Sequence, residues 1–167
     1  EDKTIIIYRE LYQKGLTGLA LASKITELEK NEIRSIYGVL DTAAWARTGY
    51  SGPTIGEILN QKGHKLRRAD KNRIAGKIQI HEYLRKNVST GRPKLQIFNS
   101  CQNLIRELQS LPLSKTNSED VDTKASDHAY DALRYMLMSR PKLDHPYDRM
   151  LKIKTDIYQP ADSTFGY

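Results

Sequence analysis

The sequence predicts an α/β domain, and two observations support this class. The chain has 167 residues, which is enough for one domain with a sizeable core. Segments rich in β-branched and aromatic residues alternate with segments whose apolar residues recur every three or four positions. Strands and helices that alternate in this way pack as a sheet with helices on both faces. We expect one domain over residues 1–140 and an irregular C-terminal extension over 141–167.

The first part of the chain predicts a strand, a helix and a second strand. Residues 4–12 contain three consecutive isoleucines and two tyrosines, which favour a strand. Residues 17–30 favour a helix that begins after Thr17 as its N-cap. Residues 33–40 favour a second strand, which ends at Asp41. The apolar positions of the helix are Leu21, Ile25 and Leu28.

The rest of the domain continues the alternation. A short helix over 54–61 stops at Gly63, and a short strand follows over 64–69. Further helices are expected over 72–86, 100–111 and 126–139, and a strand over 94–98. The apolar positions of the 72–86 helix are Ile74, Ile78 and Leu84.

Charge and composition narrow the function classes. Lysine and arginine number 27 against 20 aspartates and glutamates, so the net charge is +7 and favours a polyanionic partner, usually nucleic acid. A single cysteine, Cys101, excludes an intrachain disulfide and a cysteine-based zinc site. No apolar run of about 18 residues occurs, so no transmembrane helix is expected.

Asp41 is the first candidate for chemistry. It follows a predicted buried strand, and open α/β sheets place their sites at the carboxyl ends of strands. An aspartate at this position can equally cap the following turn. The sequence leaves both roles open.

The last predicted helix contains a second acidic group. Asp127 and Asp131 are four residues apart and share one helix face, and His128 lies close to the same face. Carboxylate oxygens are ligands that Mg²⁺ and Mn²⁺ prefer, and a cation would relieve the repulsion between them. The structural alternative is an acidic pair that favours the helix dipole, with Ser126 as N-cap. That alternative explains Asp131 less well, because we expect this residue beyond the first turn. The apolar face expected to pack on the sheet comprises Ala129, Ala132, Leu133 and Met136.

Basic residues gather in two groups that can neutralise phosphates, although a solvated surface is the commoner reason for such runs. The first group follows the Asp41 strand and contains Lys62, Lys65, Arg67, Arg68, Lys71 and Arg73. The second begins near the end of the last helix and contains Arg140, Lys142, Arg149, Lys152 and Lys154. Tyr147 and Tyr158 lie within the second group and could stack on bases. We expect structural roles for Trp45, His64, His81, His145 and a buried Cys101.

Five stretches of the chain, in order, resemble the nuclease domain of tailed-bacteriophage terminase large subunits. The last of them, Asp-His-Ala-Tyr-Asp-Ala-Leu-Arg-Tyr over 127–135, is the most specific, and the similarity runs from about Ile5 to Tyr135. The other stretches are 39–49, 52–57, 72–76 and 95–105. The resemblance implies a ribonuclease-H-like mixed sheet flanked by helices. The first two strands of that fold and its first acidic residue have no match here, and we expect them upstream of Glu1.

The resemblance also implies a function. The family joins an ATPase motor to a nuclease that cuts concatemeric double-stranded DNA during genome packaging, together with portal and small terminase subunits in the host bacterial cytoplasm and away from membranes. Two Mg²⁺ or Mn²⁺ ions would be held by an upstream acid with Asp41, Asp127 and Asp131, of which Asp131 is the favoured ligand on its helix. His128 would complete the catalytic set, and the basic groups from Lys62 to Arg73 and at Arg140 and Lys142 would contact DNA. The alternative is a non-catalytic domain that binds DNA or docks in the packaging machine.

Overall fold

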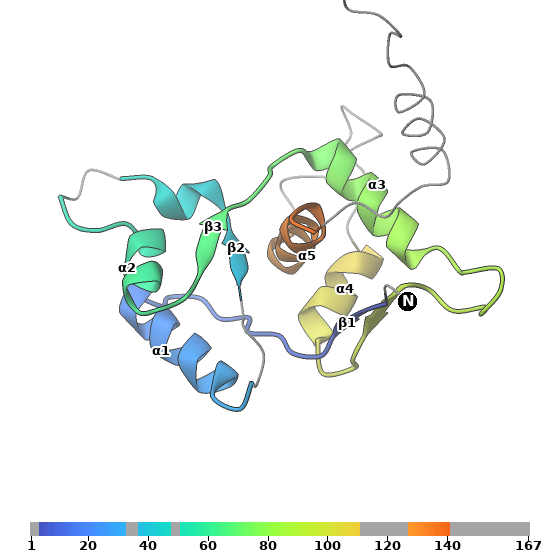
Figure 1. The fold of residues 1–167 in the computed structure, drawn as a ribbon, viewed down its shortest axis with the longest axis horizontal. Coiled ribbons are helices and arrows are strands. Elements are labelled where there is room, and N and C mark those ends of the chain that lie inside the picture. The colour runs from blue at the N-terminus through green and yellow to red at the C-terminus, as the bar shows by residue number, and fades with distance from the viewer. Residues whose placement is uncertain (1–3, 33–36, 48–50, 111–126, 141–167) are drawn as a thin grey trace, which may run out of the picture.

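The computed structural model describes residues 4–32, 37–47, 51–110 and 127–140, and confirms a mixed α/β protein (Figure 1). Four short strands pair in parallel as β1 with β4 and β2 with β3. Within these ranges the strands form two separate two-stranded sheets, and no larger mixed sheet is present. The extension expected over 141–167 lies outside the described residues. The strands are β1 (Ile5–Ile7), β2 (Gly38–Leu40), β3 (Leu66–Arg68) and β4 (Leu95–Ile97).

The first strand is shorter than the stretch 4–12 that the sequence predicts. Its register pairs Ile5 with Leu95 and Ile7 with Ile97, and the last ladder bond joins the Phe98 amide to the Ile7 carbonyl at 2.9 Å. Beyond this point β4 turns into a helix, so the following residues lose their strand partner. Glu10 then bonds to the start of that helix instead.

In the described part of the chain, five α-helices and one 3₁₀ helix accompany the strands. Side chains at the N-cap position begin three of the α-helices: the hydroxyl of Thr17 accepts from the Ala20 amide, Thr54 forms a capping box with Glu57, and Asn72 accepts from the Ala75 amide. The helices are α1 (Gly18–Glu29), α2 (Ile55–Gln61), α3 (Arg73–Leu84), α4 (Gln102–Ser110) and α5 (His128–Met138), and η1 is the 3₁₀ helix (Thr42–Trp45). None of the helices within the described ranges is long and apolar enough to cross a membrane.

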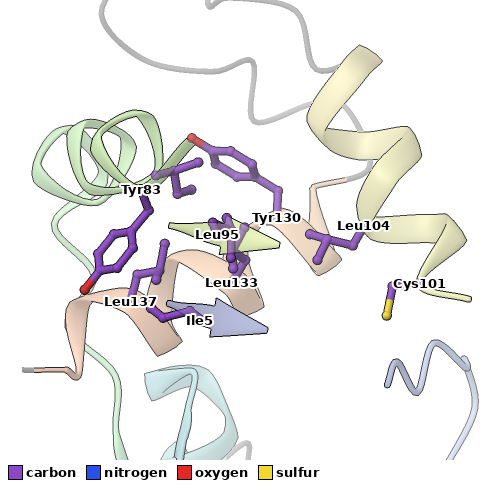
Figure 2. Close-up of a cluster of buried hydrophobic side chains, with 9 residues drawn as sticks. Ile5, Tyr83, Leu95, Cys101, Leu104, Tyr130, Leu133 and Leu137 are labelled. Carbon is purple, nitrogen blue, oxygen red and sulfur yellow. The ribbon is translucent and has the colours of Figure 1, made fainter. Parts of the chain in front are cut away.

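Helix α5 lies at the centre of the described structure. It packs against α3, α4 and β2, so it connects the two strand pairs (Figure 1). Tyr130, Leu133 and Leu137 of α5 are buried together with side chains from β1, β4, α3 and α4 (Figure 2). Ala129 and Met136 pack against this core, whereas Ala132, which we expected to pack on a sheet, is exposed. Cys101 is fully buried, as expected.

The buried face of α3 differs from the face that its sequence predicts. Ile74, Ile78 and Leu84 are 42%, 58% and 40% exposed, so that prediction is wrong. The face toward α5 instead contains Gly76, Ile80 and Tyr83. The reason is a close approach: a Cβ added at Gly76 would lie 2.3 Å from Cγ of Arg134, so only a glycine leaves room for that arginine.

Candidate functional site

Two aspartates that are distant in sequence meet at one tyrosine. Asp41 follows β2, whereas Asp131 and Tyr135 are one turn apart on α5. The Tyr135 hydroxyl donates a short hydrogen bond to Oδ2 of Asp41 and also lies 3.2 Å from Oδ2 of Asp131. Since a hydroxyl has a single proton, it donates to one carboxylate at a time. The contact of α5 with β2 therefore brings Asp41 and Asp131 to the same point in the structure. We call this meeting point of Asp41, Asp131 and Tyr135 the Tyr135 junction.

Asp41 has the capping role that the sequence left open, and its second carboxylate oxygen faces Tyr135. Its Oδ1 accepts from the Ala43 amide at 2.6 Å and so caps η1, while Oδ2 faces Tyr135. Lys71 adds a cation 3.5 Å from Oδ1. Burial raises the pKa of Asp41, but the bonds from Tyr135 and Ala43 and the charge of Lys71 outweigh burial and hold the pKa below its usual value. Asp41 is therefore a carboxylate at neutral pH.

Asp131 is held by an arginine on its own helix. Nε and Nη2 of Arg134 lie 3.1 and 2.9 Å from Oδ1 of Asp131, and both atoms donate to it. The Arg134 side chain is 2% exposed, and its guanidinium also lies over the Tyr135 ring, 4.6 Å from the centroid. Two donors on one oxygen orient the carboxylate, and they leave Oδ2 facing Tyr135.

Asp127 occupies the N-cap position of α5 without capping it, since its side chain makes no cap hydrogen bond. Its Oδ2 lies 3.8 Å from Nη2 of Arg73. Burial raises the pKa of Asp127, and the negative charge of Asp131 adds to this effect.

The helix begins at His128, so Asp131 falls within its first turn, and our expectation that it lies further along was wrong. Ser126, the expected N-cap, lies outside the described residues.

A cavity of about 650 Å³ adjoins Asp41, and Asp41 and Tyr135 line it together with His128 and Arg140. Tyr8 and Tyr37, which are 49% and 58% exposed, also line it. The His128 ring tilts toward Tyr12, with 6.4 Å between the ring centroids. His128 lines the same cavity as Asp41 and Tyr135, and within the described residues it makes no hydrogen bond to the aspartates.

The basic residues of the first group fall into three pairs. Lys71 and Arg73 face the acidic residues Asp41 and Asp127. Arg67 donates to the Ser139 carbonyl at 2.8 Å, and Arg68 lies over the Trp45 ring. Lys62 and Lys65 are exposed near β3. Lys142 and the basic residues after it lie outside the described ranges.

The donor chemistry at the Tyr135 junction suits a hard divalent cation, because two carboxylates meet there. Across the ranges that the structure describes, no group of three or more histidine, cysteine, aspartate or glutamate side chains could hold a metal ion. Asp41 and Asp131 bring two carboxylates to this point, and Lys71 and Arg134 already pair with them.

Two residues of this site were missed as candidates from sequence. Tyr135 and Arg134 lie four and three positions after Asp131, so helical spacing places them near its face, and that spacing was the available signal. The approach of Asp41 to Tyr135, 94 residues away, had no local signal.

Comparison with family models, with curated proteins and with solved structures gave no match.

Proposed function

We propose that this chain is the metal-dependent nuclease domain of a phage terminase large subunit, with a ribonuclease-H-like fold that acts on double-stranded DNA. The observation that carries the proposal is the meeting of Asp41 and Asp131 at the Tyr135 hydroxyl. An acid after a strand and an acid on the last helix are the pair that the resemblance assigns to the metal. In the intact protein, the ATPase motor, the portal and the small terminase subunit would be its partners.

The charged residues around the junction would prepare the site for a cation and for DNA. Asp41 and Asp131 would hold Mg²⁺ or Mn²⁺, and Asp127 would lie beside them. The bound metal would supply Lewis-acid assistance to phosphodiester hydrolysis. The hydrogen bond from Tyr135 helps to lower the pKa of Asp41, and Arg134 orients Asp131, so both carboxylates are directed before a cation arrives. The exposed Lys62 and Lys65 are suited to phosphate contacts, which carry no base specificity.

A nuclease assay on supercoiled plasmid with Mg²⁺ or Mn²⁺ tests this proposal. We expect Asp41→Asn and Asp131→Asn each to lower cleavage more than about 100-fold, because loss of even an indirect metal contact costs about 10–100-fold. In Asp41→Asn the amide oxygen of the new side chain can still accept from the Ala43 amide, so the fold should survive. Glu27→Gln on the exposed side of α1 is the matched control. Cleavage that persists in both aspartate variants would refute the site.

A second candidate is a non-catalytic domain that binds DNA. It is favoured by the cations that already face the three aspartates, namely Lys71, Arg73 and Arg134. Calorimetric titration with Mn²⁺ separates the two functions. Binding that disappears in Asp41→Asn and Asp131→Asn supports the nuclease. Salt-dependent DNA binding by a wild-type chain that takes up no Mn²⁺ supports the binding domain.

A further inference from the structure

The N-terminus of α5 is capped by a residue from another helix. Glu107 of α4 is 2% exposed, and its Oε2 accepts from the amides of Ala129 and Tyr130 at 2.8 and 3.0 Å. Its Oε1 accepts from the Tyr12 hydroxyl at 3.0 Å. Both oxygens of this buried carboxylate therefore have donors, and its charge lies at the positive end of the helix dipole.

Glu107 accepts hydrogen bonds from the two amides that normally donate to an N-cap side chain. Helix α5 begins at His128 with Asp127 at the N-cap, so Ala129 and Tyr130 occupy the second and third helical positions. An N-cap aspartate ordinarily accepts from these positions, and its carboxylate is then occupied. Here Asp127 makes no such bond, although aspartate is among the best capping residues.

A glutamate from another segment also caps the N-terminus of helix α4. Glu10, which follows β1, accepts from the amides of Asn103 and Leu104 at 3.2 and 2.8 Å and from the Asn103 side chain at 2.6 Å. Cys101 precedes this helix and cannot supply a strong acceptor. Glu10 therefore holds α4 to the segment after β1, and Glu107 in turn holds α5 to α4.

We propose that Glu107 is a positioning residue for the candidate site: it replaces Asp127 as the cap of α5, fixes the start of that helix, and leaves the Asp127 carboxylate available beside Asp131. The capping part stands on the geometry alone. The part that concerns metal binding rests on the proposed function.

A double-mutant cycle in urea unfolding tests the capping part. In the wild-type background, Asp127→Ala should change the unfolding equilibrium constant less than about two-fold, because Glu107 already holds both amides. In the Glu107→Ala background, Asp127 can turn to cap its own helix, so Asp127→Ala should then raise that constant roughly five-fold. An equal cost in both backgrounds would overturn the capping assignment.

Hydrogen exchange covers the case in which Glu107→Ala does not fold. Glu107→Gln keeps one carbonyl oxygen for the two amides and should fold. The Ala129 and Tyr130 amides should stay protected in Asp127→Ala and in Glu107→Gln. Loss of their protection in Asp127→Ala would overturn the proposal, because it would make Asp127 the cap.

Mn²⁺ titration tests the positioning part. We expect Glu107→Gln to bind Mn²⁺ within about two-fold of the wild-type chain and Glu107→Ala to bind about ten-fold more weakly, as for other indirect ligand supports. If Glu107→Ala does not fold, Tyr12→Phe, which removes the donor to Oε1, should weaken Mn²⁺ binding by less than Asp131→Asn does. If a folded Glu107→Ala variant bound Mn²⁺ with the affinity of the wild-type chain, the positioning role of Glu107 would be overturned. Absence of Mn²⁺ binding in the wild-type chain would refute the proposed metal site and leave the capping cycle as an independent result.

Discussion

Gly76→Ala is predicted to destabilise the protein through Arg134 alone. The added Cβ would lie 2.3 Å from Cγ and 2.6 Å from Cδ of Arg134. Arg134 is buried and bonded to Asp131 through two nitrogens, so it cannot turn aside without breaking those bonds. The substitution should therefore shift Arg134 away from Asp131.

The magnitude follows from two opposing terms. Alanine in the interior of a helix gains about 1 kcal/mol over glycine. Overpacking in a close-packed interior costs about 1–3 kcal/mol, and the clash with two methylene carbons belongs at the upper end of that range. We therefore expect a net loss of about 1–2 kcal/mol in the free energy of unfolding.

Removal of the clashing Arg134 atoms should reverse the sign of the change that Gly76→Ala makes in the free energy of unfolding. In an Arg134→Ala background, Cγ and Cδ are absent, so Gly76→Ala should stabilise the helix by about 0.5–1 kcal/mol. The four proteins form a double-mutant cycle, measured by urea unfolding at pH 7. Gly18→Ala is the control, since its Cβ would meet Ile58, with Cδ1 at 3.0 Å, and not Arg134, so its effect should be equal in both backgrounds. Additivity of Gly76→Ala and Arg134→Ala within about 0.5 kcal/mol would refute the reasoning.

Two further predictions concern ionisable groups. The pKa of Asp41 is lowered in the folded state, so its ionised form adds stability above the pKa of the unfolded chain, about 3.9, and this contribution is lost as the pH falls through the folded value. The difference in unfolding free energy between wild type and Asp41→Asn should thus shrink from pH 6 to pH 2.5, and a constant difference in urea titrations would contradict this. Burial raises the pKa of the Cys101 thiol and leaves it no exposed surface, so Ellman's reagent should label it only in denaturant. Rapid labelling of the native chain would show that Cys101 is not buried in the core.

Sequence reasoning succeeded where the deciding interaction is local. Thr17 was expected to cap α1, and it accepts from an amide three residues ahead. Gly63 was expected to stop α2, and its φ of +96° is a conformation that glycine adopts readily. The apolar core positions of α1 are partly buried as its spacing indicates. These features depend on contacts within about one helical turn, which neighbouring residue types determine.

The same reasoning failed where two faces or two partners compete. Helix α3 has an apolar stripe through Ile74 and Ile78, yet it buries the side with Gly76, because that side admits Arg134. Sequence reasoning expected the local residue Ser126 to cap α5, whereas Glu107 of α4 accepts from the Ala129 and Tyr130 amides. In each case the local preference is worth about 1 kcal/mol, and packing against another helix outweighs it.

By itself, then, the sequence determined the α/β class, the order of the elements and the two acidic positions that merit testing, because periodicity and residue type carry that information. Only the tertiary structure decided that Asp41 and Asp131 share the Tyr135 hydroxyl and that Asp127 is free of its capping role. The physical reason is separation along the chain. Asp41 lies 94 residues from Tyr135, and Glu107 lies 22 residues from Ala129, so no local pattern records either contact.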